Sequence, residues 1–173
     1  METTKQTSKE FFKTLTIIHL ALTFGLVFVG IIGSFLILSG KMTNNGNDLN
    51  KIFLYIVPIV SLGGLFFSNL IYKNKLSELK EKNDLNIKMT NFRGVLIVRY
   101  AFIEGPTFFA FVATILTGNL VFLAFIVLMI LAMIYWRPTK NSVIADLELN
   151  YQEVEIINNP DSIIAEFSNT KRN

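Results

Sequence analysis

The sequence predicts an all-α, polytopic membrane protein, with four transmembrane helices in an antiparallel bundle and a short helical cytoplasmic tail. Hydrophobic residues make up 51% of the chain and charged residues only 17%, which is more apolar than an average soluble domain. The charges are concentrated in residues 1–13, in 73–93 and after 136. They therefore separate apolar runs that are long enough to cross a bilayer.

Residues 1–13 are polar and basic and form the predicted cytoplasmic N-terminal segment. A first transmembrane helix is predicted over residues 14–38, because its apolar run is longer than the roughly 7 to 15 residues of a signal-peptide core. Gly30, Gly33 and Ser34 form a small-residue face on this helix. Such a face lets another helix approach closely.

A loop rich in Asn and Gly precedes the second transmembrane helix, predicted over residues 52–72. Pro58 lies inside it and should kink the helix, because proline lacks the backbone N–H. Ser61, Gly64 and Ser68 repeat at intervals of three and four and form a second small-residue face. Helix packing is the expected use of that face.

The third and fourth transmembrane helices are predicted over residues 94–117 and 119–136. So short a connection forces neighbouring helices to run antiparallel. The fourth helix contains no ionisable residue and ends in Tyr135 and Trp136, an aromatic anchor typical of a membrane interface. Residues 14–136 are thus expected to form one transmembrane domain.

Residues 137–173 are the predicted cytoplasmic C-terminal tail. Asn150 followed by Glu153 is the pattern of a capping box and predicts a helix start. A further short helix is expected from Asn159 to Phe167. The tail also carries apolar side chains, which could dock either on the chain's own cytoplasmic loop or on a partner.

The distribution of basic residues predicts the orientation. Lysines and arginines lie in the N-terminal segment, in the 73–93 loop and at the start of the tail. The opposite side of the membrane, which the loop between the first two helices faces, has only Lys41 and Lys51. By the positive-inside rule both termini are cytoplasmic, and we expect a multi-pass protein of the cell inner (cytoplasmic) membrane. The basic residues border apolar runs, which suits lipid headgroups and argues against a nucleic-acid partner.

Glu104 is the residue that most needs an explanation. It lies about 15 Å along the third helix from Gly94, near the middle of a hydrocarbon core of about 30 Å. Tyr100 is on the same helix face, and Pro106 should free a backbone carbonyl beside the carboxyl group. Two interpretations stay open: a protonated acid that is hydrogen-bonded across the bundle, or a group that handles an ion or a proton.

Arg99 and His19 are the other ionisable residues of the predicted spans and complete the hypothetical ion or proton site. Arg99 is about 7 Å from Gly94 along the helix and is expected to extend its side chain to the cytoplasmic headgroups. His19 lies near the cytoplasmic end of the first helix, where an interfacial hydrogen bond is favoured over a proton relay.

The second helix, the basic loop and the third helix together resemble the helical hairpin of the proteolipid (c) subunits of rotary ATPases. The stretch FIEGPTFFAFVATIL is similar in layout to the carboxylate-bearing helix of that family. The resemblance implies that Glu104 would be the proton or sodium site, with Gly63 and Gly64 on the inner helix. It covers neither the first nor the fourth helix nor the tail.

Two functional hypotheses follow. The first is an accessory or scaffold subunit of a larger inner-membrane complex, which contacts a membrane-protein partner or a second copy through small-residue faces and the tail. The second is a proton- or cation-handling subunit that uses Glu104 and works as an oligomer. The chain has no cysteine and one histidine, and neither a metal-ligand cluster nor a nucleophile with a base nor a cofactor motif is recognisable. We therefore expect no enzyme, no metal and no cofactor.

Overall fold

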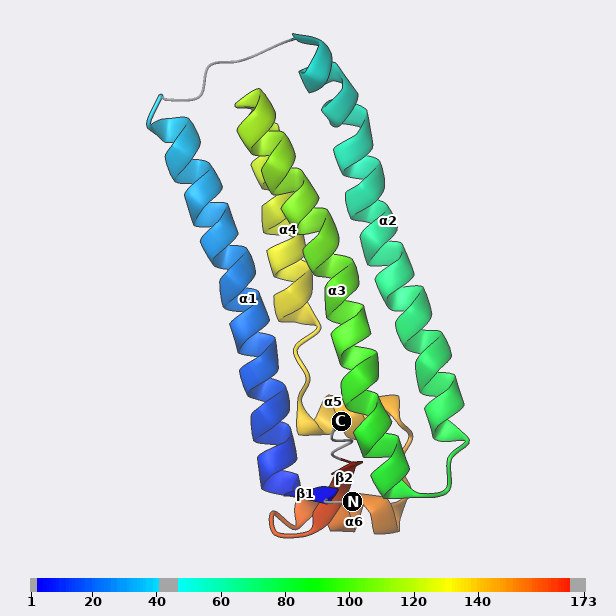
Figure 1. Cartoon of the computed structure of the whole chain (residues 1–173). Coiled ribbons are helices and arrows are strands. Elements are labelled where there is room, and N and C mark those ends of the chain that lie inside the picture. The colour runs from blue at the N-terminus through cyan, green and yellow to red at the C-terminus, as the bar shows by residue number, and fades with distance from the viewer. Residues whose placement is uncertain (1–2, 41–46, 169–173) are drawn as a thin grey trace, which may run out of the picture. The chain divides into compact units, whose positions relative to one another are not determined.

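The computed structural model describes residues 3–40 and 47–168, and within them it contains six helices and two short strands (Figure 1). Their order along the chain is β1 (Thr3–Thr7), α1 (Ser8–Leu38), α2 (Asn47–Lys80), α3 (Leu85–Thr117), α4 (Val121–Tyr135), α5 (Lys140–Asp146), α6 (Tyr151–Asn158) and β2 (Ile163–Ser168). The predicted helical class is confirmed, with one small sheet in addition. Lys41, which was used to predict the orientation, lies outside the described residues.

Three helices are long and apolar enough to cross a membrane: α1, α2 and α3, with 31, 34 and 33 residues. α4 has 15 residues and counts as a fourth candidate only if it and α5 form one span. The helices also extend beyond the predicted spans. α1 begins at Ser8, before residue 14. α2 continues past residue 72 to Lys80, and this confirms the exposed helical extension, breaking near Asn83, that the helical spacing of Leu76 and Leu79 predicts.

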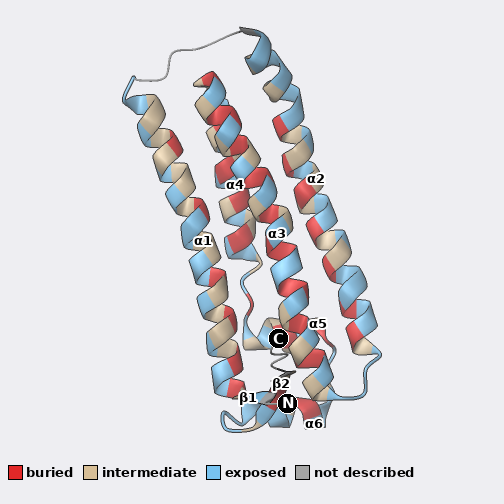
Figure 2. Cartoon of the chain, in the orientation of Figure 1, coloured by how far each residue is buried: buried red, intermediate tan, exposed pale blue. Residues whose placement is uncertain are grey.

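The chain forms two compact units. Of the described residues, the polar unit comprises 3–19, 71–97 and 138–168, and the apolar unit comprises 20–40, 47–70 and 98–137. Each long helix contributes one part to each unit. Buried and exposed positions alternate along the helices, so each helix has a packed face and an outward face (Figure 2).

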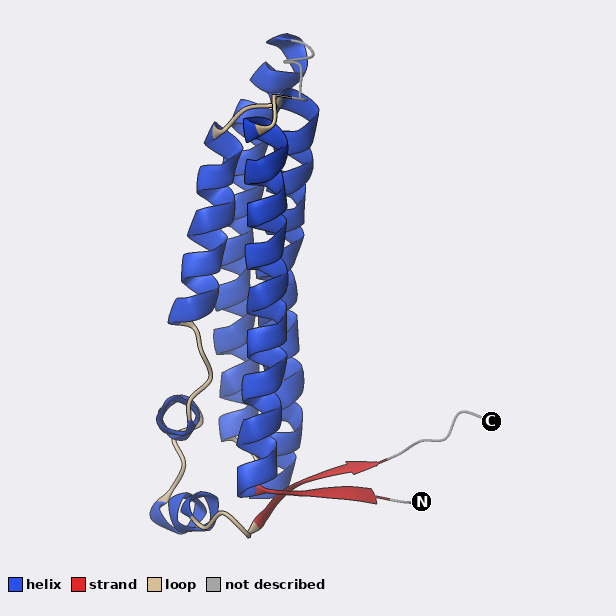
Figure 3. Ribbon diagram, turned by 90° about the vertical axis from the view of Figure 1, so that its left-hand side faces the viewer, coloured by secondary structure: helices blue, strands red, loops and turns tan. Residues whose placement is uncertain are grey.

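In the polar unit, β1 and β2 pair in an antiparallel sheet and are the red arrows of Figure 3. The prediction of a helix from Asn159 to Phe167 is wrong, because β2 occupies Ile163–Ser168. Thr3 lies opposite Ser168 in the register. β-Branched residues favour strands, and a partner strand can satisfy the backbone of this segment better than an isolated short helix could.

The C-terminal segment also caps the first helix. Backbone N–H groups of Ser8 and Lys9 donate to the carbonyls of Ser162 (2.8 Å) and Pro160 (3.1 Å). The Ser8 hydroxyl donates to the carbonyl of Ile157 (2.6 Å) and is buried. The first amide groups of a helix have no partner within it, so here the tail supplies the acceptors.

The tail packs on its own chain, as the first of the two alternatives expects. Its side chains Val143, Leu147, Ile157 and Ile164 are fully buried. The capping box predicted at the start of α6 is confirmed: Asn150 and Glu153 each accept a hydrogen bond from the other's backbone N–H. The tail is therefore part of the polar unit.

Side chains of the tail also bond to the other two long helices. The Tyr72 hydroxyl of α2 donates to Asp146 (2.7 Å). Lys88 of α3 donates to Glu153 (2.8 Å), and the two side chains are only 7% and 8% exposed. Residues of α1, α2 and α3 are thus all bonded to the segment 146–162.

The apolar unit has its own core, in which Val57 of α2, Ala110 and Ala113 of α3, and Phe122 and Ile126 of α4 are buried together. The ring of Phe53 contacts those of Phe109 and Phe122 edge to face. α1 joins this core through its glycines. A Cβ atom built on Gly30 would lie 3.4 Å from Ile126, and one on Gly33 would lie 3.2 Å from Leu123. Side chains of α4 therefore pack closely against both glycines.

Candidate functional site

Glu104 lies on α3 in the apolar unit, at the boundary between the packed and the outward face of the helix. Buried neighbours on one side are Tyr100, Ile103 and Thr107, and exposed neighbours on the other are Ala101, Gly105 and Phe108. Within the part of the chain that the structure describes, neither a hydrogen bond nor an ion pair reaches the Glu104 carboxyl group. The group is therefore half-buried and open to something outside the chain.

The backbone carbonyl freed by Pro106 does not provide a second ligand for an ion at Glu104. Pro106 removes the hydrogen bond to the carbonyl of Phe102, four residues earlier. A Cβ atom built on Gly64 of α2 would lie 2.7 Å from that carbonyl oxygen and would overlap the Pro106 ring. The oxygen is thus covered by the Gly64 backbone, where a weak Cα–H···O contact can replace part of the lost bond.

Arg99 is buried within the chain. Its guanidinium carbon lies 4.1 Å from the ring centroid of Trp136, at the end of α4, in cation–π geometry. Its backbone carbonyl accepts a hydrogen bond from Ser68 of α2 (3.1 Å). The aromatic face offers the buried cation a favourable electrostatic partner, and the two contacts together join α2 and α3 with the end of α4.

Tyr100 and His19, the other members of the predicted site, are both buried. Tyr100 is one helical turn from Glu104 but lies on the packed side of α3, so the two side chains have different surroundings. His19 belongs to the polar unit and is the last residue of that unit on α1.

The small-residue face of α2 packs against α3. Ser68 bonds to the carbonyl of Arg99, and Gly64 lies against Phe102 and Pro106. Ser61 is fully buried, and among the described residues its hydroxyl oxygen has no hydrogen-bond partner. The face therefore serves contacts inside the chain.

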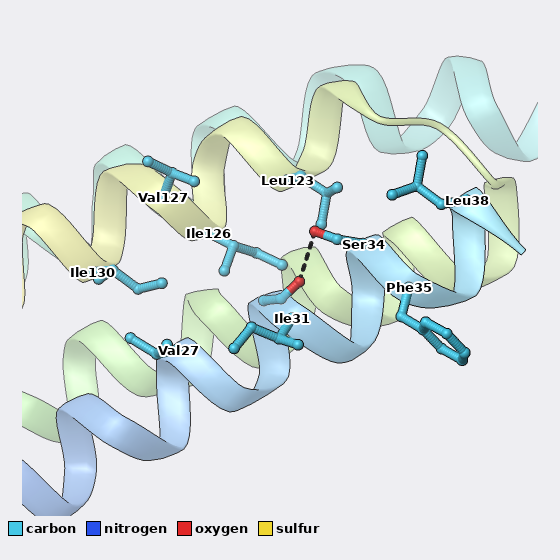
Figure 4. A pocket seen from close by; sticks show the side chains of 10 residues that line it. Val27, Ile31, Ser34, Phe35, Leu38, Leu123, Ile126, Val127 and Ile130 are labelled. Atoms are coloured by element: carbon cyan, nitrogen blue, oxygen red, sulfur yellow. Dashed lines mark hydrogen bonds between the residues drawn. The ribbon is translucent and has the colours of Figure 1, made fainter.

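An apolar groove of about 450 Å³ runs between α1 and α4 (Figure 4). Its lining side chains include Val27, Ile31, Phe35, Leu123, Ile126 and Ile130. The one polar side chain in the lining is Ser34, and its hydroxyl donates to the carbonyl of Gly30 (2.9 Å), the dashed line in Figure 4. The groove thus offers no free polar group to orient a polar substrate.

The described residues include no group of three His, Cys, Asp or Glu side chains that could hold a metal ion. No protein-family model, curated protein or solved structure matches the chain.

Three contacts were missed by reasoning from the sequence: Arg99 with Trp136, Gly64 with the Phe102 carbonyl, and the buried pair of Lys88 and Glu153. A signal existed for the second, because proline always frees the carbonyl four residues earlier and a glycine opposite it can approach closely. The other two join helices through side chains, and no local pattern identifies such partners.

Proposed function

We propose that the chain is a four-span protein of the cell inner (cytoplasmic) membrane and serves as an accessory or scaffold subunit of a larger membrane complex, without a catalytic role. The half-buried Glu104 carboxyl group, which has no partner among the described residues, carries the proposal. A carboxyl group deep in the bilayer costs about 2.5–3.5 kcal/mol unless it is satisfied. A second chain that contacts this edge of α3 would supply the missing hydrogen bond.

The pairing of β1 with β2 supports four spans. β1 precedes every apolar helix and β2 follows all of them, yet the two strands are hydrogen-bonded. An open two-stranded sheet is not tolerated within lipid, so both strands belong on one side of a bilayer. The chain then crosses an even number of times. If α1, α2 and α3 cross, α4 must cross as well.

The length of α4 is compatible with a helix that crosses the bilayer. Its 15 residues extend over about 22 Å, which is shorter than a hydrocarbon core of about 30 Å. A short span is accommodated by local thinning of the bilayer and by its flanking interfacial residues, here Trp136 and Arg137.

Exposed apolar side chains support the placement of the apolar unit in lipid. On α1 these include Phe24 (68% exposed), Phe28, Ile31 and Phe35, and large exposed residues continue on α2, α3 and α4. Soluble monomers rarely expose contiguous apolar patches beyond a few hundred Å². In a bilayer the same surface has no cost.

The proposed contact surface is the outer edge of α3 around Glu104. The tail and the small-residue faces are less suitable, because both already make contacts inside the chain. Deletion of residues 141–173 is therefore expected to destabilise the polar unit, because it removes Val143 and Leu147, which are fully buried in the core of that unit. Unfolding measured in detergent would show this directly. A truncated chain as stable as the full one would contradict the internal docking of the tail.

Substitutions at Glu104 test the scaffold role. A neutral acid and an amide can both hydrogen-bond, so E104Q should keep the native assembly size on a native gel, whereas E104L should reduce it. G105A is the matched control, because a Cβ atom built on Gly105 meets nothing within 4 Å. Loss of assembly in E104Q, or none in E104L, would overturn the proposed contact.

The same carboxyl group favours the second candidate, a proton- or cation-handling subunit. A group open at the outward face can be reached by a lipid-soluble carbodiimide, which reacts with the protonated acid. In this case sodium or high pH slows labelling of Glu104. E104Q then abolishes proton or cation transport in vesicles, although the assembly is intact. Labelling that is indifferent to both conditions would remove this candidate.

A further inference from the structure

The lysines of the polar unit fall into two groups. Those of the first group each have an acidic partner: Lys5 with Glu166, Lys75 with Glu78, Lys80 with Glu148 and Lys88 with Glu153. Lys9, Lys13 and Lys140 have none within 4.0 Å in residues 3–40 and 47–168. We call these three residues the basic cluster. Lys73 and Lys82 are also unpaired but do not belong to it.

One contact brings the basic cluster together. Lys9 and Lys13 are one helical turn apart on α1 and both are exposed. The Lys140 ammonium group at the start of α5 lies 5.8 Å from the centroid of the Phe12 ring, which is on the same turn of α1. Residues far apart in the sequence therefore place three cations around one stretch of helix.

The acid nearest in sequence does not neutralise the cluster. The Glu10 carboxylate accepts a hydrogen bond from the backbone N–H of Thr7 (3.0 Å) and so caps the start of α1. Like charges one turn apart repel each other. Since no acidic side chain of the described residues pairs with the three lysines, an anion outside the chain would stabilise this arrangement by balancing their charge.

The cluster borders the apolar runs. Lys13 and Lys9 precede Leu15, the first residue of the first apolar run, by about 3 Å and about 9 Å along the helix. Lys140 follows the apolar α4 after four residues. Headgroup layers add about 5–8 Å on each side of the hydrocarbon core, so flexible lysine side chains at these positions reach the headgroups.

We propose that the basic cluster binds the phosphate groups of anionic phospholipids at the cytoplasmic surface of the bilayer. The charge of the cluster complements that of the phosphates, and its position matches the depth at which they occur. The inference rests on the proposed membrane location of the apolar unit.

The test uses the full chain in vesicles of phosphatidylcholine and phosphatidylglycerol in equal amounts. After extraction, the ratio of the two lipids that co-purify with the protein is measured by mass spectrometry. We expect enrichment of phosphatidylglycerol that decreases with salt. The triple variant K9Q/K13Q/K140Q should lose this enrichment, because each lysine near a charged surface strengthens the binding of anionic lipid by about five-fold.

Two controls make the result specific. The variant K75Q/E78Q removes a paired lysine together with its exposed partner and should keep the enrichment. The variant K9R/K13R/K140R retains the charges and should also keep it. An unchanged lipid ratio in the glutamine variant would overturn the inference. A chain that fails to float with pure phosphatidylcholine vesicles would instead overturn the membrane proposal.

Discussion

Replacement of Gly64 by alanine is expected to destabilise the apolar unit by about 3 kcal/mol, at the upper end of what an added methyl group costs in a packed core. The new Cβ atom would overlap the Pro106 ring and lie 2.7 Å from the carbonyl oxygen of Phe102. Both obstacles are rigid, because one is a ring and the other is backbone. Unfolding in mixed micelles, followed by circular dichroism, measures the effect.

The adjacent glycine provides a matched control. A Cβ atom built on Gly63 meets nothing within 4 Å, so G63A should be neutral or stabilising, by up to about 1 kcal/mol of helix propensity. In the double variant G64A/P106A the ring is gone and the Phe102 carbonyl regains its helical donor, so part of the stability should return. Equal effects of G64A and G63A would show that α2 and α3 do not meet at Gly64.

Replacement of Lys88 by methionine is expected to lower the free energy of unfolding of the polar unit by about 3–5 kcal/mol, the usual effect of leaving a buried charge unpaired. Lys88 and Glu153 are 7% and 8% exposed, and their Nζ and Oε1 atoms are 2.8 Å apart. The uncompensated Glu153 carboxylate also holds the start of α6 in the capping box. Chemical unfolding of the full chain in detergent measures the loss.

An exposed pair tests whether burial is the cause. Lys75 and Glu78 are also 2.8 Å apart but are 52% and 62% exposed, so K75M should cost only about 0–1 kcal/mol. In K88M/E153Q neither charge remains and glutamine can still close the capping box, so most of the stability should return. If K88M costs no more than K75M, the pair is not buried in solution.

The helices could be predicted because their signals are local. Apolar runs indicated each long helix, and the spacing of Asn150 and Glu153 marked the start of α6. The start of α1 was less certain, because residues 8–13 are mostly polar yet belong to the helix, where the tail caps it.

The sheet could not be predicted, because each strand is short and its partner lies at the other end of the chain. The contact of Arg99 with Trp136, the residue that follows α4, could not be predicted for the same kind of reason, because the two residues lie far apart in the sequence. The place of Glu104 inside the third apolar run was readable from the sequence. Its position at the edge of the packed face depends on which sides of α3 the other helices cover, and this is a tertiary property.

The β1–β2 pair also sets an order of events during synthesis. The ribosome makes β1 before any apolar helix, whereas β2 is complete only when residue 168 has been added. Until then β1 is an unprotected strand edge, which can pair with the strand of another copy. The two strands can therefore pair only after all the helices between them have been synthesised, and a blocked β2 would favour strand exchange between nascent chains.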